Sequence, residues 1–170
     1  MAVILGIDPG SRICGYGLIN SVGNSLEFIA CGCIKIGTRP FPERLQIIHA
    51  GLTEIIAKYS PQQAAIESVF VGKSANSALK LGQARGAAIV ACTNQALEIS
   101  EYAPRQVKRA VVGTGTADKG QMQHMVTSIL SLSAQPQEDA ADALCIAVCH
   151  AHTQASLIRR AGPRSRRVSV

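Results

Sequence analysis

The sequence predicts an α/β fold with a mixed five-stranded sheet, an antiparallel meander followed by parallel strands, flanked by helices. Two observations carry this prediction. The N-terminal part contains three apolar runs separated by turn sequences, Pro9-Gly10 and Val22-Gly23-Asn24, which join neighbouring strands. From residue 41 onward, short apolar runs alternate with longer segments of helical periodicity, which is the pattern of parallel strands joined by crossover helices.

The meander is expected to consist of strands at residues 3–7, 15–21 and 25–36. Residues 41–59 then form an amphipathic helix that Pro61 ends. Its apolar residues recur at helical spacing and predict its buried face: Leu45, Ile48, Leu52, Ile55 and Ile56.

The rest of the chain supplies two more strands, at residues 63–68 and 98–102, with the first of them parallel to strand 3–7. Helices are expected at residues 77–97 with Asn76 as the N-cap, from Pro104, at residues 118–132, and from Pro136 to about His152. In helix 77–97, Gly82 and Gly86 lie four residues apart, so one face lets another backbone approach closely. That face packs either on the sheet or against a second subunit.

The composition indicates one domain, residues 1–152, followed by a basic tail at residues 153–170 that we expect to be disordered. Lys and Arg number 17 against 11 Asp and Glu, which favours a polyanionic partner. No apolar window is long enough to span a membrane, and no basic region precedes an apolar signal core, so we expect a cytoplasmic protein. The six cysteines are expected to be reduced and not to bind a structural metal, and His150 and His152 to end the last helix.

Four carboxylates occupy unusual positions. Asp8 and Glu67 each end a short apolar strand, and parallel neighbouring strands would bring both to one edge of the sheet. Asp139 and Asp142 share one face of the last helix. The alternative is that Asp8 only caps its turn and that Asp139 and Asp142 only complement the helix dipole. If the four converge, an oxygen-only ligand set favours Mg²⁺, with Mn²⁺ as a substitute.

Seven basic residues fall between positions 73 and 119, which makes a basic face plausible. A basic protein with a carboxylate cluster for hard cations suggests hydrolysis of a phosphodiester of a nucleic acid. Two ions per site would activate water and stabilise the leaving oxygen. The cations expected to contact the nucleic acid backbone are Lys73, Arg85, Arg105, Lys108 and Lys119.

Several separated motifs occur in order along the chain: LGIDPGSR at residues 5–12, GYG at 15–17, AIESVF at 65–70, SALKLGQARG at 77–86, RQVK at 105–108 and DAADA at 139–143. Together they closely resemble the motifs of bacterial RuvC-type Holliday-junction resolvases. The resemblance implies an RNase H-like fold and a homodimer. It also implies an endonuclease that uses Mg²⁺ to nick two opposed strands of a four-way DNA junction in recombination and repair.

The same resemblance implies roles for individual residues. Asp8, Glu67, Asp139 and Asp142 would be the catalytic metal ligands. Phe70 matches an aromatic residue that stacks against opened bases. Lys108 and Lys119 match catalytic basic positions near the scissile phosphate. The resemblance further implies cooperation with a RuvA–RuvB branch-migration complex.

Two other classes of protein share part of this pattern. An actin- or sugar-kinase-like ATPase also opens with a Gly-Ile-Asp-x-Gly strand and turn, but it needs two such domains around its nucleotide. A non-catalytic DNA-binding module would explain the basic charge, but four acids near phosphate would oppose binding.

Overall fold

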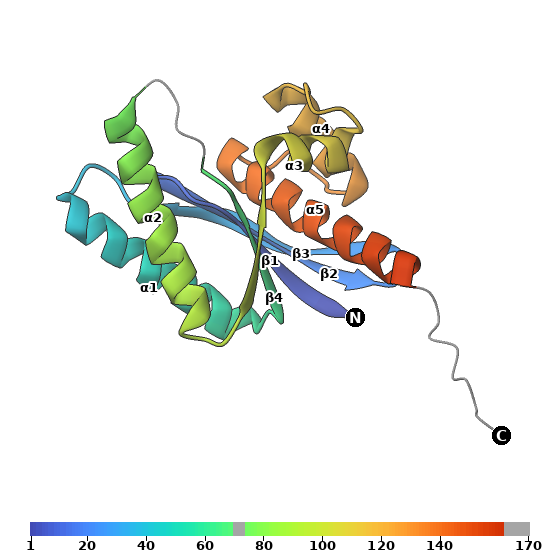
Figure 1. Ribbon diagram of the computed structural model, residues 1–170, viewed down its shortest axis with the longest axis horizontal. Helices are drawn as coiled ribbons and strands as arrows, with labels where there is room; N and C mark the ends of the chain where they lie inside the picture. The colour runs from blue at the N-terminus through green and yellow to red at the C-terminus, as the bar shows by residue number, and fades with distance from the viewer. Residues whose placement is uncertain (70–73, 162–170) are drawn as a thin grey trace.

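The computed structural model describes residues 1–69 and 74–161, which form a mixed sheet between two layers of helices (Figure 1). Across these residues the strands are β1 (Ala2–Asp8), β2 (Ile13–Val22), β3 (Ser25–Lys35), β4 (Gln63–Glu67) and β5 (Glu98–Tyr102). Their order in the sheet is β3-β2-β1-β4-β5. The first three strands are antiparallel neighbours, and β4 lies parallel to both β1 and β5. The predicted sheet is therefore confirmed.

The helices cover both faces of the sheet (Figure 1). Helices α1 (Phe41–Tyr59) and α2 (Ala75–Thr93) pack on one face, and α3 (Pro104–Val112), α4 (Lys119–Ile129) and α5 (Glu138–Ala161) on the other. Each face has its own apolar core. Among the described helices, none combines the length and apolar character that crossing a membrane requires.

The alternation of side chains along the strands decides which way the two strand-end carboxylates point. In β1, Ile4 belongs to the core under α5, whereas Leu5 and Ile7 belong to the core under α1 and α2. In β4, Ala65 packs on the α5 side and Ile66 on the other. Continuing each alternation by one position places Asp8 and Glu67 on the face that carries α3, α4 and α5.

Glycines in β1 and β2 let α5 lie directly on the sheet. A Cβ atom at Gly6 would overlap the backbone carbonyl oxygen of Ala143, and a Cβ at Gly15 would overlap that of Asp139. A Cβ at Gly17 would collide with Leu144. Any larger residue at these positions would push the first two turns of α5 away from the strands.

Helix α2 differs from the prediction at both ends. It begins at Ala75, and its N-cap is Ser74, whose hydroxyl accepts a hydrogen bond from the backbone N–H of Ser77, rather than Asn76. It ends at Thr93, before residue 97, because a turn follows in which Ala96 adopts a left-handed conformation with φ of 58°.

The glycine face of α2 does not pack on the sheet, which was one of the two expectations. A Cβ atom at Gly82 or at Gly86 would meet no atom of the described residues within 4 Å. Within the described part of the chain, this face of α2 is therefore uncovered.

Helix α5 is longer than predicted and continues past His152 to Ala161. The residues after His152 are mostly good helix formers, and Arg159 and Arg160 in the last turn complement the helix dipole. The first half of the expected tail is thus helical, and residues 162–170 lie outside the described residues.

Candidate active site

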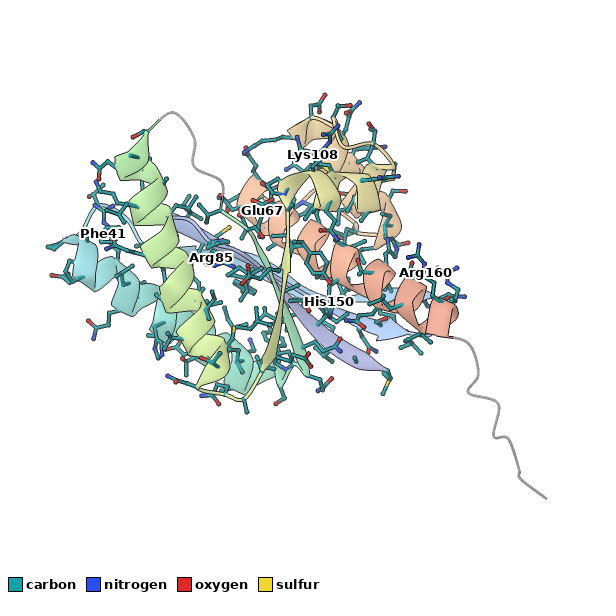
Figure 2. The ribbon with its side chains drawn as sticks, in the orientation of Figure 1. Phe41, Glu67, Arg85, Lys108, His150 and Arg160 are labelled. Carbon is teal, nitrogen blue, oxygen red and sulfur yellow. The ribbon has the colours of Figure 1, made fainter. Side chains whose placement is uncertain are left out.

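A cavity of about 320 Å³ opens where the C-terminal ends of β1 and β4 meet helices α3, α4 and α5. It brings together five of the six predicted catalytic residues. Figure 2 shows Glu67 between α2, which carries Arg85, and α3, which carries Lys108. The cavity is lined by Asp8, Glu67, Lys108, Lys119, Asp142, Pro104, Val107, Met122 and Cys145.

The sheet register places the first two carboxylates side by side. Ile7 of β1 pairs with Ile66 of the parallel strand β4, so Asp8 and Glu67 are the next residues of two adjacent strands. Asp142 comes from the first turns of α5, next to Ala143, whose carbonyl lies over Gly6. The close approach of α5 to β1 therefore brings Asp142 to the carboxylates of the sheet.

Asp139 lies one turn before Asp142 and is not among the residues that line the cavity. Its negative charge still contributes to raising the pKa values of Asp8 and Asp142. Asp139 thus belongs to the same electrostatic cluster, at its margin.

Burial and mutual repulsion destabilise the charged forms of these acids. The pKa of Asp8 is raised to about 7, first by burial and then by the charges of Asp142, Glu67 and Asp139. Burial is also the main cause that raises the pKa values of Glu67 and Asp142. Within residues 1–69 and 74–161, none of the four acids forms an ion pair. The site therefore has more negative charge than its neighbouring lysines neutralise.

Two lysines face this cluster from separate helices. Lys108 of α3 and Lys119 of α4 line the cavity, and both charges lower the pKa values of Glu67 and Asp142. The Lys119 ammonium pairs with the Glu138 carboxylate at the start of α5, and this hydrogen bond is the main cause that raises the pKa of Lys119. Glu138 therefore holds Lys119 at the edge of the cavity.

Asp118 is a residue whose role sequence reasoning missed. Its side chain accepts a hydrogen bond from the backbone N–H of Gln121, and the Gln121 side chain accepts one from the backbone N–H of Asp118. This reciprocal cap fixes the first turn of α4, which carries Lys119. The Asp-x-x-Gln spacing was the signal that could have revealed it.

The donor set of the cavity fits a hard divalent cation. Among the described residues, no three His, Cys, Asp or Glu side chains already lie close enough together to surround an ion. The carboxylates instead stand around an open cavity, with surplus negative charge that a cation would neutralise. Burial raises the pKa of the Cys145 thiol, which favours the neutral thiol over the thiolate in this wall of the cavity. Oxygen ligands of this kind favour Mg²⁺ or Mn²⁺ over softer metals.

The residues predicted to contact DNA differ in their exposure to solvent. Arg105 is exposed on α3, whereas the side chain of Arg85 is largely buried and turned toward the sheet. A phosphate contact by Arg85 stays a prediction that this geometry disfavours. Phe70 and Lys73 lie outside the described residues.

His150 has a different place from the one expected, because α5 does not end there. It is buried, with 2% of its surface exposed. Its Nδ1 lies 2.8 Å from the Tyr102 hydroxyl and its Nε2 lies 3.1 Å from Oε1 of Gln63. His150 thereby ties α5 to β4 and β5, the two strands on the Glu67 side of the site.

The chain is similar to known proteins over most of its length. The family model described as "Crossover junction endodeoxyribonuclease RuvC" matches residues 4–150. The protein of that name from Photobacterium profundum is 58% identical over 165 residues, which cover 97% of this chain and 95% of the relative. The one from Klebsiella pneumoniae subsp. pneumoniae is 60% identical over 152 residues, covering 89% and 88%.

A solved structure described as "T. thermophilus RuvC in complex with Holliday junction substrate" has a TM-score of 0.86 and 33% identity. The alignment covers 92% of this chain and 96% of that chain, so the predicted RNase H-like fold is confirmed. The chain therefore belongs to the RuvC family of crossover junction endodeoxyribonucleases, as the order of its sequence motifs predicts.

Proposed function

We propose that the chain resolves four-way DNA junctions by metal-dependent hydrolysis of phosphodiester bonds, in homologous recombination and DNA repair. The observation that carries the proposal is the group of three partly buried carboxylates and two lysines around one cavity, with the pKa of Asp8 raised to about 7. Membership of the RuvC family supports the reaction class. The junction bound to the T. thermophilus relative supports the substrate.

Asp8, Glu67, Asp139 and Asp142 are the proposed metal ligands. Mg²⁺ is the proposed metal, with Mn²⁺ as a substitute and two ions per site. When bound, such ions supply an activated water and stabilise the oxygen that leaves. Metal binding also relieves the repulsion that raises the pKa of Asp8, so it favours the ionised carboxylates.

The lysines act on the phosphate. Lys108 and Lys119 line the same cavity as the carboxylates, where their ammonium groups can hold the non-bridging oxygens of the scissile phosphate. The pair with Glu138 orients Lys119 before DNA arrives. Val107 and Met122 form apolar parts of the wall, and the reduced exposure to water strengthens these charge interactions.

The chain acts as a homodimer in this proposal, with α2 as the contact. Leu79 and Val90 are 64% and 48% exposed, and they share a face of α2 with Gly82 and Gly86, around which residues 1–69 and 74–161 leave open space. A second copy could therefore approach this apolar, small-residue face closely. Two active sites related by a twofold axis would cut two opposed strands symmetrically.

The remaining interactions stay predictions. Phe70 is proposed to stack on bases opened near the junction centre, and Lys73 and Arg105 to contact the DNA backbone. A RuvA–RuvB branch-migration complex is the proposed functional partner, and the cytoplasm the proposed location.

Incubating the protein with a synthetic four-way junction and with a linear duplex, in Mg²⁺ and in EDTA, tests this proposal. We expect paired, symmetric nicks on the junction in Mg²⁺ alone. ATP turnover without nicking would favour the kinase-like alternative. Junction binding without nicking in either Mg²⁺ or Mn²⁺ would favour a non-catalytic binding module.

A further inference from the structure

Arg85 connects helix α2 to the ends of two strands at the edge of the site. Its Nε donates a hydrogen bond to the backbone carbonyl of Glu67, with 3.1 Å between the heavy atoms. Its Nη2, which is shielded from solvent, lies 2.6 Å from Oε2 of Glu101 in an ion pair that lacks the alignment of a hydrogen bond. One guanidinium thus contacts both β4 and β5.

The sheet geometry explains why these partners are available to α2. Tyr102 belongs to the core on the α5 face, and Ile99 packs in the core on the α2 face. Glu101, two residues after Ile99, therefore points toward α2, where Arg85 meets it. The side chain of Arg85 is only 17% exposed, so most of it is unavailable to a DNA backbone.

The contact lies where the backbone of β4 leaves the sheet. Glu67 is the last residue of β4, and the next residue, Ser68, donates its backbone N–H to the carbonyl of Tyr102 at 2.9 Å. The Glu67 carbonyl is held by Arg85 from the opposite layer. These two hydrogen bonds fix the peptide plane between Glu67 and Ser68, and hence the direction of the Glu67 side chain.

We propose that Arg85 is a positioning residue that orients the Glu67 carboxylate for metal binding, and that Glu101 holds Arg85 in place. The inference rests on the proposed function, because it treats Glu67 as a metal ligand. For this positioning role, the N–H group of Arg85 that donates to the Glu67 carbonyl matters more than the charge of the side chain. An arginine that contacts DNA phosphate needs its charge.

Comparing Arg85→Gln with Arg85→Met in the full chain separates the need for an N–H donor from the need for a charge. Gln offers an N–H donor without charge, and Met offers neither. We expect Arg85→Met to weaken Mn²⁺ binding about 10- to 100-fold, as removal of a group that orients a metal ligand does. Calorimetric titration with Mn²⁺ in the absence of DNA measures this directly. Arg85→Gln should recover part of the loss.

Junction binding in EDTA separates the two roles. We expect the affinity of Arg85→Met and the salt dependence of that affinity to match the wild type. A phosphate contact would instead lower the affinity and reduce the slope against salt by about 1. Such a result, together with unchanged Mn²⁺ binding, would overturn the inference.

Four further variants separate the roles of Arg85, Glu101 and Glu67. Glu101→Gln should weaken Mn²⁺ binding in the same direction as Arg85→Met, and the double variant should add little, because both act through one contact. Lys58→Gln, at the end of α1, is the charge-matched control and should leave Mn²⁺ binding unchanged.

Glu67→Gln tests the proposed function itself: if it retains normal Mn²⁺ binding, Glu67 is not a ligand. If Glu67→Gln loses binding while Arg85→Met does not, only the role of Arg85 is refuted.

Discussion

Replacing Asp8 with Asn should stabilise the metal-free protein at neutral and alkaline pH. The folded state raises the pKa of Asp8 from 3.8 to about 7, so it binds the proton more tightly than the unfolded chain does. The contribution of Asp8 to the free energy of unfolding is therefore fully retained below about pH 4 and is lost as pH rises toward 7. At about 1.4 kcal/mol for each pH unit, the loss reaches up to about 4 kcal/mol above pH 7.

Urea unfolding in EDTA at pH 5 and pH 8 measures this difference. We expect the free energy of unfolding of Asp8→Asn to exceed that of the wild type by about 1–4 kcal/mol at pH 8, and by roughly half as much or less at pH 5. Adding Mg²⁺ at pH 8 should stabilise the wild type and leave Asp8→Asn nearly unchanged, because the ion binds the charged carboxylate. Glu54→Gln, which removes an exposed charge on α1, is the control. Equal pH dependence in wild type and Asp8→Asn would refute the reasoning.

Three other predictions concern the contact of α5 with the sheet, the proposed dimer and the proposed role of Phe70. Gly15→Ala should lower stability by about 1–3 kcal/mol in urea unfolding, because its Cβ would push against the Asp139 carbonyl, and an unchanged midpoint would show that α5 can move freely. Leu79→Glu should sediment as a monomer at micromolar concentration where the wild type is a dimer, and a monomeric wild type would count against the α2 interface. Phe70→Ala should lose cleavage more than junction affinity, whereas full activity would remove Phe70 from the proposed mechanism.

The antiparallel meander and the meeting of Asp8 with Glu67 could be predicted from sequence, because the turn residues and the strand-end carboxylates are visible as local patterns. An apolar run that ends on a carboxylate is visible in one dimension, and parallel pairing of such runs brings their ends together. The hairpin turn at Gly23 fixes the meander in the same way. Helix α1 also matches the prediction, since its apolar spacing and Pro61 mark both its buried face and its end.

The glycines beneath α5 could not be interpreted in this way. Gly15 and Gly17 lie two residues apart and so share one face of β2, but their role, like that of Gly6, depends on which helix crosses them. The sequence motif GYG signalled membership of a family without giving its physical reason. Only the three-dimensional contact shows that these positions let α5 bring Asp139 and Asp142 to the sheet.

The buried polar contacts of Arg85 and His150 could not be predicted from the sequence either. In the sequence, Arg85 is one of several cations in a basic stretch, and His150 is one of two histidines near the end of a helix. Their partners are distant in the chain: Glu67 and Glu101 for the arginine, Tyr102 and Gln63 for the histidine. Periodicity cannot distinguish a buried polar contact of this kind from a surface charge.

The central claim is that the carboxylate cluster performs the cleavage of DNA and not merely its binding. Single-turnover cleavage of a synthetic four-way junction by Asp8→Asn, measured beside its junction affinity in EDTA, tests this claim most directly. We expect cleavage to fall by roughly 10³-fold or more, since a lost metal ligand removes several kcal/mol of transition-state stabilisation. Affinity should stay close to that of the wild type. Retained cleavage, or loss of junction binding together with folding, would contradict the account and leave Asp8 as a structural residue.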